Sequence, residues 1–376
     1  ALIVVFIVCF LIGFITTMNN SMISFCSKAF DLTAQQGQYV NTAFYGAYLL
    51  SIPFAMLMSK IGYKGTLILG LAVAGIGFVI NSIGINSAIA AQANVYTVFL
   101  ASMCLVACGV VMLQNVANPY VMVLGSPEKG AFRMTLSQAL NSVATTLAPL
   151  FITYVIIRKQ DPTPSAVPAP FLGLGIFTLA ICVILVFLKL PKIDEGKQAE
   201  DAGIHREYKS SVFKYPHVWL GALGIFMYMG VEIGVPSMLP YKFRDMPGVG
   251  EDYTSIATSY LAFYWGGMMV GRFIGAAILA KFEPRKLLTS CLVLGAACIL
   301  LSVVLPDMVG IWCMIAAGLF HSVMWPLIFN LGLQELGPHT KSATGVINTG
   351  VIGAALLMPV MGKLVDSTSV IVASCC

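Results

Sequence analysis

The chain has 376 residues, of which 58% are hydrophobic and only 10% are charged, whereas soluble domains have about 45 to 50% apolar and about 25% charged residues. Apolar runs of about 20 residues, long enough to cross a bilayer, recur along the whole chain. These features exclude a soluble globular protein and predict an all-α polytopic membrane protein. The net charge of +5 then reflects loop topology and does not indicate binding to nucleic acid.

The apolar runs predict eleven membrane helices, at residues 1–24, 36–58, 64–84, 94–125, 131–157, 170–190, 217–243, 254–280, 285–305, 308–336 and 341–365. The sequence starts without Met inside an apolar run, and it ends with STSVIVASCC, which looks like the first turns of a further helix. We therefore expect a longer chain with twelve helices. Residues 1–190 are expected to form an N-terminal six-helix half, residues 191–216 a cytoplasmic linker, and residues 217–376 a C-terminal half with helices 7 to 11 and the start of helix 12.

The basic residues predict the orientation in the membrane. With a cytoplasmic N-terminus, fourteen of them lie on the inner side: Lys60, Lys64, Lys129, Arg133, Lys189, Lys192, Lys197, Arg206, Lys209, Lys214, Lys281, Arg285, Lys286 and Lys341. Six lie on the outer side: Lys28, Arg158, Lys159, Lys242, Arg244 and Lys363. Cytoplasmic loops carry an excess of Lys and Arg, so the N-terminus is predicted to be cytoplasmic.

No enzymatic site is indicated by the sequence. It shows no nucleophile paired with a base, no phosphate-binding loop and no metal-ligand motif, so we predict neither an enzyme nor a metal or other cofactor. The ten cysteines are mostly single residues within helices. Even Cys104 and Cys108, which share a helix face, are interpreted as small packing residues.

The two halves of the chain resemble each other. AMLMSKIGYKGTLILG follows the second helix and GAAILAKFEPRKLLTS follows the eighth, while Ala-Phe-Tyr occurs upstream at 43–45 and again at 262–264. The spacing of about 220 residues predicts a six-helix unit repeated in parallel. The two short basic loops resemble the signature of the major facilitator superfamily, although Ser59 and Ala280 replace its usual acidic residue. The resemblance implies transport by alternating access, with Lys60, Lys64, Lys281 and Arg285 in loops that hold one closed state.

A narrower resemblance lies in helices 4 and 5. LQNVANPYVMVLG at 113–125 and AFRMTLSQALNS at 131–142 resemble the fucose-galactose-glucose/proton symporter branch of that superfamily. This implies a secondary transporter in the bacterial inner membrane that imports a monosaccharide such as glucose, galactose, fucose or fructose. It is expected to be a monomer surrounded by lipid, coupled to protons or sodium. A carrier of another small polar solute, such as an amino sugar or nucleoside, and a sugar sensor that does not transport remain alternatives.

Polar side chains inside the predicted helices mark candidate contacts to a solute. An amide buried in hydrocarbon without a partner costs about 2–7 kcal/mol, so each must face another helix or a cavity. The residues concerned in the first half are Asn19, Asn20, Ser21, Gln114, Asn115, Asn118, Gln138 and Asn141. They predict a shared polar cavity, with interhelical hydrogen bonding as the alternative. Gln138 and Asn141, one turn apart, present two amides to one side, and the resemblance implies that both contact sugar.

The second half contributes an aromatic and polar stretch. In GLFHSVMWPLIFNLGLQELG, at 318–337, His321, Trp325 and Asn330 lie near one helix face. An indole plane suits the apolar face of a pyranose, and His or Asn can bind its hydroxyl groups. Packing beside a proline remains the alternative for Trp325, and a core histidine that is hydrogen-bonded within the protein remains the alternative for His321. Further candidates are Asn348, Tyr45, Tyr48 and Tyr264.

One acidic residue lies near the middle of a predicted helix. This is Glu232, and Arg272 in the eighth helix is its candidate partner. A carboxylate at this depth costs about 2.5–3.5 kcal/mol, which makes a role in transport the default hypothesis. A paired Glu232 would stay ionised and structural, whereas an unpaired one could carry a proton. Beside Arg272, glycines at 267, 271 and 275 predict a close helix contact, so Arg272 should point toward a carboxylate, backbone carbonyls or the cavity.

The sequence departs from the resembling branch at two positions. Its proton-coupled members carry an Asp in helix 1 and a Glu in helix 4, where this chain has Asn20 and Gln114. Neither amide can bind and release a proton in this way. Coupling through Glu232, coupling through sodium, no coupling, or an engineered form that mimics the protonated state are the open alternatives.

Overall fold

The computed structural model describes residues 2–30, 39–157, 163–191, 208–244, 246 and 253–357. All regular elements in these residues are helical, which confirms the predicted all-α class. The α-helices are α1 (Leu2–Ala29), α3 (Tyr39–Gly46), α4 (Ser51–Ala90), α5 (Val95–Val123), α6 (Gly130–Phe151), α7 (Pro168–Phe187), α9 (Pro216–Arg244), α10 (Tyr253–Leu279), α11 (Pro284–Val304), α12 (Asp307–His321), α13 (Met324–Gly332) and α14 (Thr340–Thr349).

Short helical turns join some of these helices. The turns are η1 (Ala47–Leu50), η2 (Pro127–Lys129), η3 (Ile152–Ile157, a π-helix), η4 (Pro164–Ala166), η5 (Val212–Lys214), η7 (Gly337–His339) and η8 (Gly350–Ile352). Residues 353–357 are also helical. Eight stretches of the described chain are long and apolar enough to cross a membrane. One of them, Tyr39–Ala90, contains two predicted spans, whereas the more polar α6 and α14 are not among the eight.

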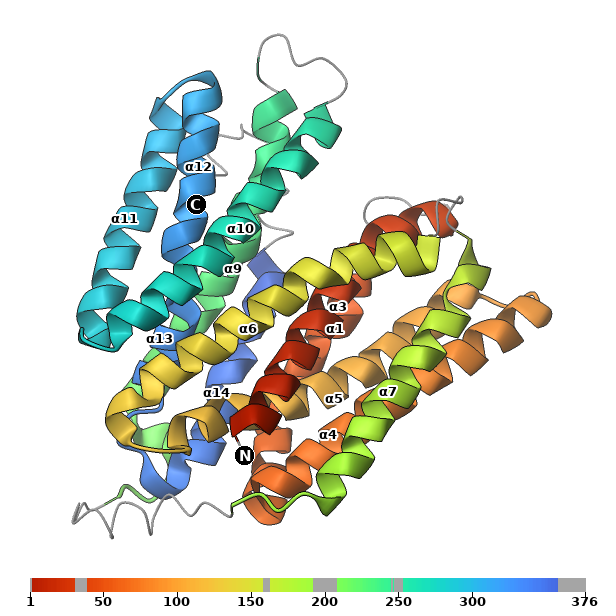
Figure 1. Ribbon diagram of the computed structural model, residues 1–376, viewed down its shortest axis with the longest axis horizontal. Helices are drawn as coiled ribbons and strands as arrows, with labels where there is room; N and C mark the ends of the chain where they lie inside the picture. The colour runs from red at the N-terminus through yellow and green to blue at the C-terminus, as the bar shows by residue number, and fades with distance from the viewer. Residues whose placement is uncertain are drawn as a thin grey trace. The chain divides into compact units, whose positions relative to one another are not determined.

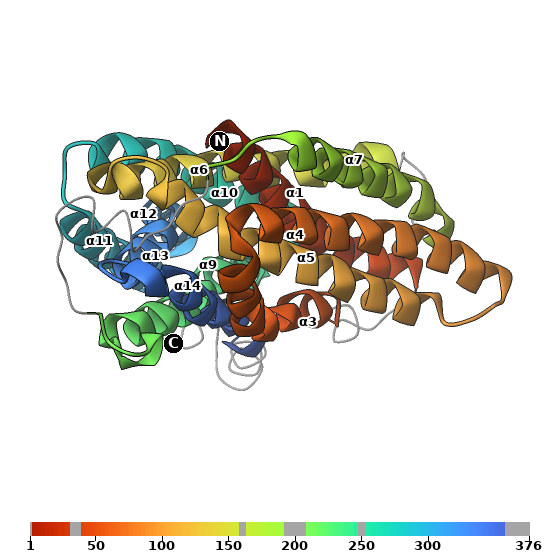
Figure 2. The ribbon, with the colours of Figure 1, turned by 90° about the horizontal axis from the view of Figure 1, so that it is seen from below.

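The first of two compact units contains Ala1–Leu124, Leu140–Lys214 and Glu335–Thr349. In this unit α4 packs along α5 and α7 (Figures 1 and 2), and α14 also packs against α4. Glycine permits the close contact between α4 and α5. A Cβ at Gly109 would lie 2.6 Å from the Gly70 carbonyl oxygen and 2.7 Å from the Ala74 side chain, so a larger residue would separate the helices.

The second unit contains Gly125–Ala139, Tyr215–Gln334 and Gly350–Cys376. Here α12 packs against α11 and α10, and α9 packs against α10 and α13. The predicted glycine ridge of α10 is confirmed: Gly271 faces Leu319 and Ser322, and Gly275 faces Val323. This contact brings α10 against the last turn of α12 and the residues that follow it. The boundaries of the predicted sequence halves and linker stay a prediction, since residues 192–207 lie outside the described residues.

The backbone departs from regular helix at one predicted helix boundary and inside one predicted helix. Gly62 has φ 75° within α4, a conformation that glycine adopts without a steric penalty, and it marks the predicted break between helices 2 and 3. The helix predicted at 308–336 is a single apolar stretch at Asp307–Gly332 but not a continuous helix, because α12 ends at His321 and α13 runs from Met324 to Gly332. Pro326 explains the interruption, since it has no N–H to donate to the carbonyl four residues earlier.

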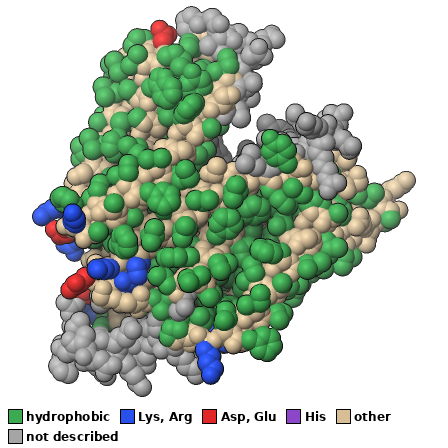
Figure 3. All heavy atoms as spheres, in the orientation of Figure 1, with side chains coloured by type: hydrophobic (Ala, Val, Ile, Leu, Met, Phe, Trp, Pro, Cys, Tyr) green, Lys and Arg blue, Asp and Glu red, His purple; other side chains and the backbone are tan. Residues whose placement is uncertain are grey.

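The helices present apolar side chains at the surface of the protein. Phe187 is 81% exposed, Val304 77% and Ile3 75%, and on the face that Figure 3 shows, hydrophobic side chains cover most of the described surface, with few charged ones. Large exposed apolar areas on a soluble monomer would be unusual. Hydrocarbon around the helices accounts for them, in agreement with a multi-pass membrane protein.

Candidate functional site

In the first unit, Gln114 is held by a tyrosine. The Tyr48 hydroxyl donates to Gln114 Oε1 at 2.5 Å, and the Tyr45 and Tyr48 rings lie 6.2 Å apart. Tyr48 is buried, and Gln114 is half-buried in α5. Three predicted residues, Tyr45, Tyr48 and Gln114, therefore form one polar aromatic group, and a neutral amide stands where the resembling branch has a carboxylate.

The neighbouring Asn115 joins three helices. Its Oδ1 accepts from Ser51 Oγ at 2.8 Å and from Asn348 Nδ2 at 2.7 Å, while its Nδ2 donates to the Ser51 carbonyl at 2.9 Å. All three side chains are fully buried. These hydrogen bonds tie α14 to α4 and α5, although residues 115 and 348 are more than 200 positions apart in the sequence. Their geometry is that of interhelical bonding, and a contact of Asn348 with sugar stays a prediction.

The other predicted amides have different surroundings. Asn141 Nδ2 donates to the Cys9 carbonyl of α1 at 2.8 Å, and Asn19 Nδ2 donates to Asn41 at 3.4 Å. Asn20 lies in α1, but its side chain is outside the described residues. Gln138 is a half-buried residue of the second unit. The shared polar cavity stays a prediction, and Asn141 already contributes to packing of α1.

In the second unit, Glu232 and Arg272 are paired. Arg272 Nη2 lies 3.4 Å from Glu232 Oε1, with the two side chains 10% and 15% exposed. Arg272 Nε also donates to the Ser322 carbonyl at 3.2 Å, and its Nη1 to the Gln138 carbonyl at 3.5 Å. The side chain thus points to a carboxylate and to backbone carbonyls, as predicted. The separation exceeds the roughly 2.7–2.9 Å of a strong charge-assisted hydrogen bond, so this ion pair is loose.

Two tyrosines connect this pair to His321. The Tyr264 hydroxyl lies 3.1 Å from His321 Nδ1 and 3.4 Å from the Glu232 carbonyl oxygen. The Tyr228 hydroxyl donates to the His321 carbonyl at 3.1 Å. His321 is 2% exposed, and a Cβ at Gly295 would lie 3.2 Å from its Nε2. This arrangement corresponds to the core histidine that the sequence left as an alternative, and a contact of His321 with sugar stays a prediction.

The remaining predicted residues of this unit lie on α13. The Trp325 and Phe329 rings stack with centroids 5.0 Å apart and planes 13° from parallel. Trp325 is buried, and Asn330 Oδ1 accepts from Gln334 at 3.4 Å. One face of the indole is therefore occupied by protein, which corresponds to the packing alternative for Trp325.

The four predicted loop cations are distributed between the units. In the first, Lys60 is exposed and Lys64 Nζ donates to the Val186 carbonyl at the end of α7 at 2.8 Å. In the second, Lys281 and Arg285 are exposed around the start of α11. Their predicted part in holding a closed state is not tested by these contacts. Beside Gly62, the Lys341 ammonium of α14 lies 4.9 Å from the Tyr63 ring centre, a contact that the sequence did not suggest.

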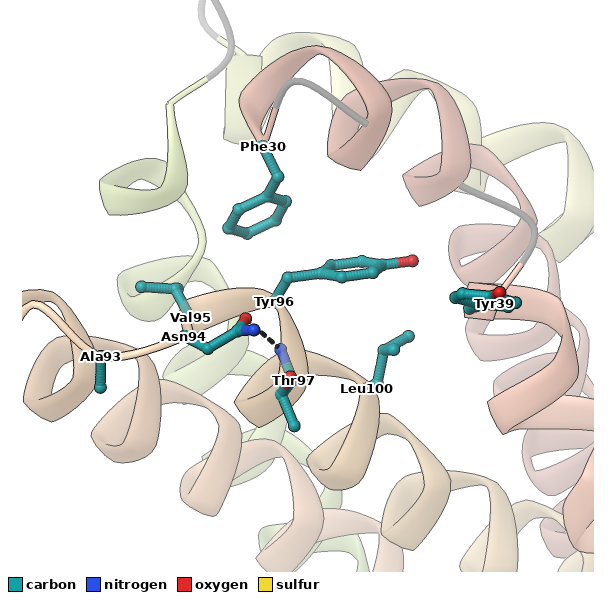
Figure 4. Close-up of a pocket in the computed structure, with 8 residues that line it drawn as sticks. All are labelled: Phe30, Tyr39, Ala93, Asn94, Val95, Tyr96, Thr97 and Leu100. Atoms are coloured by element: carbon teal, nitrogen blue, oxygen red, sulfur yellow. Dashed lines mark hydrogen bonds between the residues drawn. The ribbon is translucent and has the colours of Figure 1, made fainter. Parts of the chain in front are cut away.

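A pocket of about 540 Å³ lies in the first unit, and none of the predicted site residues lines it. It is lined by Phe30, Tyr39, Ala93, Asn94, Val95, Tyr96, Thr97 and Leu100 (Figure 4). Its one drawn hydrogen bond runs from the Thr97 amide to Asn94 Oδ1, which caps α5. The pocket lining combines aromatic and apolar side chains with polar groups, among them the Asn94 amide, which already serves the helix end.

Sequence reasoning missed two residues of the second unit. Tyr228 lies four residues before Glu232, on the same face of α9, and Ser322 lies four residues before Pro326. Both spacings are visible in the sequence. The first places an aromatic hydroxyl beside a membrane carboxylate, and the second identifies a carbonyl that proline leaves without its helical donor.

Comparison with known proteins agrees with this fold. The family model of the Major Facilitator Superfamily matches residues 5–359. A glucose/galactose transporter of Brucella abortus biovar 1 (strain 9-941) is 35% identical over 367 residues, covering 96% of this chain and 86% of that protein. An L-fucose-proton symporter of Escherichia coli (strain K12) is 27% identical over 381 residues, covering 95% of this chain and 85% of that protein.

Solved structures show the same architecture. The crystal structure of the transporter FucP in the outward conformation has a TM-score of 0.83 and 24% identity, covering all of this chain and 94% of FucP. The proton:xylose symporter XylE, bound to 6-bromo-6-deoxy-D-glucose, has a TM-score of 0.74 and 15% identity, covering all of this chain and 91% of XylE. These similarities show the fold alone.

The resemblance found in residues 113–142 is thus confirmed by relatives that are transporters and not enzymes. The family model spans nearly the whole chain, and a relative above 30% identity covers most of it. The chain therefore belongs to the major facilitator superfamily.

Proposed function

We propose that this protein imports a monosaccharide across the bacterial inner membrane by alternating access, coupled to a cation. The observation that carries the proposal is its similarity to a glucose/galactose transporter over 96% of the chain. The L-fucose-proton symporter of Escherichia coli, similar over 95% of the chain, supports both the substrate class and coupling. We also propose that the protein is a monomer surrounded by lipid and that its N-terminus is cytoplasmic.

Two half-buried amides, one in each unit, each suit a solute with several hydroxyls. Gln114 and Gln138 are half-buried, and a side-chain amide offers both a donor and an acceptor to adjacent sugar hydroxyls. A ligand reaches these half-buried groups more readily than His321, Trp325 or Asn348, which are buried. Gln114 and Gln138 are therefore the strongest of the proposed sugar contacts.

Transport requires that the sugar bind the two access states with different affinity, since equal affinity shifts no equilibrium. In this superfamily the substrate site lies near the bilayer midplane, and the two halves alternate around it. Polar side chains that change partners between the states are suited to this role. We propose the Tyr48 to Gln114 hydrogen bond for this role, because a sugar hydroxyl can replace the tyrosine as donor.

We expect the purified, full-length protein in liposomes to take up at least one labelled hexose among glucose, galactose, fucose and fructose. Binding is measured on the same folded preparation, and liposomes without protein serve as the control. Sugar binding without uptake would contradict transport and favour the sensor. Uptake of an amino sugar or nucleoside, with no hexose transported, would contradict a monosaccharide substrate and favour the carrier of another small polar solute.

We expect the substitution Gln138→Ala to weaken sugar binding by about 1–3 kcal/mol, the cost of losing a buried hydrogen bond. Equilibrium binding of the transported hexose measures the change. Asn86→Ala is the control, because Asn86 is an exposed amide near the end of α4 and should leave binding as in the wild type. An unaltered affinity of Gln138→Ala would remove Gln138 from the sugar site.

A further inference from the structure

The pocket of the first unit lies where three helices begin or end. Phe30 directly follows α1, Tyr39 is the first residue of α3, and Asn94 is the N-cap residue of α5. In Figure 4 these segments surround the pocket, and the Tyr96 hydroxyl group points toward Tyr39. With the N-terminus in the cytoplasm, as proposed above, the end of α1 and the starts of α3 and α5 lie on the outer side of the membrane. The pocket is therefore placed where a solute arrives from outside.

Three aromatic rings line the pocket, and one of them is largely uncovered. The Phe30 and Tyr96 rings lie 5.4 Å apart with planes at 46° and are only partly exposed. Tyr39 is 46% exposed. The face of an aromatic ring carries partial negative charge and attracts the C–H groups on the apolar face of a pyranose. Tyr39 thus offers a stacking surface for a sugar ring.

Polar groups lie beside these rings. Asn94 Oδ1 accepts from the Thr97 amide at 3.1 Å, so its Nδ2 is left to donate elsewhere. Within the described residues, no hydrogen bond to protein is found for Asn94 Nδ2, the Thr97 hydroxyl or the Tyr39 hydroxyl. All three residues are exposed. Together they offer an amide donor and two hydroxyl groups that can each donate and accept, which suits the neighbouring hydroxyls of a sugar.

The size and charge of the pocket favour a small neutral solute. Its volume of about 540 Å³ falls within the roughly 300–1,000 Å³ of pockets that bind small molecules, and such pockets combine apolar surface with a few polar groups. None of the lining residues is charged, so an anionic headgroup finds no cation there. A lipid chain would leave the amide and hydroxyl groups facing hydrocarbon, which is unfavourable.

The pocket is separate from the proposed sugar contact at Gln114. Gln114 lies on the same helix, fourteen residues beyond Leu100, which is the last lining residue on α5. At a rise of 1.5 Å per residue this separation is about 21 Å. A sugar in the pocket therefore does not touch Gln114.

We propose that this pocket binds the pyranose form of the transported sugar at the outer side, before the sugar reaches the transport site. The inference rests on the monosaccharide transport proposed above. Tyr39 stacks on one face of the sugar ring, while Asn94 and Thr97 bind hydroxyl groups at its edge. A weak site suffices, because the sugar must leave it again to be transported.

The substitution Thr97→Cys tests the proposal by placing a thiol in the pocket, whose lining includes no cysteine. The full-length variant in liposomes is frozen and thawed with a water-soluble maleimide, so that the reagent reaches both faces. Glucose, galactose, fucose and fructose are added in turn. At ten times its dissociation constant, a bound hexose should slow labelling about tenfold. Sorbitol, which has hydroxyls but no ring face, should have little effect.

Two controls belong to this measurement. Labelling of the wild type gives the background from its own cysteines. Ser87→Cys is the matched control, because Ser87 is exposed near the end of α4 and does not line the pocket. Its labelling should be equal with and without hexose.

A second substitution tests the stacking surface. In the Thr97→Cys background, we expect Tyr39→Leu to raise the hexose concentration that gives half protection by about twofold to twelvefold, as for the loss of one aromatic contact. Tyr154→Leu is the control, since Tyr154 is 68% exposed in η3 and does not line the pocket. It should leave the protection as it is.

The outcomes separate this inference from the proposed function. No protection by any of the four hexoses, equal protection by sorbitol, or protection unchanged by Tyr39→Leu would overturn the inference, while hexose uptake would still support transport. A thiol labelled in detergent but not in liposomes would assign the pocket to lipid and also overturn it. Protection without hexose uptake by the wild type would refute the proposed transport and leave sugar binding in the pocket standing. If Thr97→Cys does not fold, Leu100→Cys replaces it, because Leu100 also lines the pocket.

Discussion

The substitution Arg272→Met is expected to lower the free energy of unfolding by about 3–5 kcal/mol, because it leaves a buried carboxylate without its cationic partner. Methionine keeps much of the side-chain length but removes the charge and the donors. Glu232 is only 15% exposed, so water compensates little for the lost ion pair. The Ser322 carbonyl at the α12–α13 break also loses the hydrogen bond from Nε.

Denaturation in detergent micelles measures this loss, and the double variant Glu232→Gln/Arg272→Met tests its cause. With both charges removed, most of the stability should return, since a buried ion pair contributes little net free energy relative to a neutral pair. Lys286→Met is the control, because it breaks the exposed pair with Glu283 and should cost about 0–1 kcal/mol. A loss of less than 1 kcal/mol for Arg272→Met, or no recovery in the double variant, would contradict the importance of the pair.

The substitution Asn115→Leu is expected to cost about 2–4 kcal/mol, because unpaired buried polar groups each cost about 1–3 kcal/mol. It removes three hydrogen bonds and leaves Ser51 Oγ and Asn348 Nδ2 without this partner. The same detergent denaturation measures the change. Asn348→Leu combined with Asn115→Leu should recover part of the loss, since it removes one of the polar groups left behind.

A matched control for Asn115 lies in the same pair of helices. Asn81 is also fully buried, but the structure gives it one side-chain hydrogen bond, to Ser102 at 2.6 Å. We expect Asn81→Leu to be less destabilising than Asn115→Leu, since fewer polar groups of other helices are affected. An equal loss in the two variants would show that burial of the amide, and not the link between α4, α5 and α14, determines the cost.

The sequence alone predicted features that depend on local composition. Apolar length identified most membrane helices, and the glycines around Arg272 predicted a close contact of α10. The two strings in residues 113–142 identified the family branch that the relatives confirm. These predictions hold because helix length, backbone conformational freedom and the absence of a Cβ depend only on residues that are close together in the sequence.

A second group of predictions identified the residues but left their partners open. The sequence placed Glu232, Arg272 and His321 inside the membrane without deciding whether they pair, bind sugar or pack. The structure places Glu232 against Arg272, and His321 against Tyr264 and Gly295. It also interrupts the helix predicted at 308–336, where the cost of Pro326 is offset by Arg272, a residue of another helix.

By itself, the sequence determined that this protein is a helical membrane transporter of a known superfamily and which of its membrane residues are polar. Only the tertiary structure decided the partners of those residues, such as Asn115 with Asn348 and Asn141 with Cys9. The physical reason is that hydrocarbon obliges every buried polar group to find a partner, whereas the packing of helices distant in sequence decides which partner lies within reach.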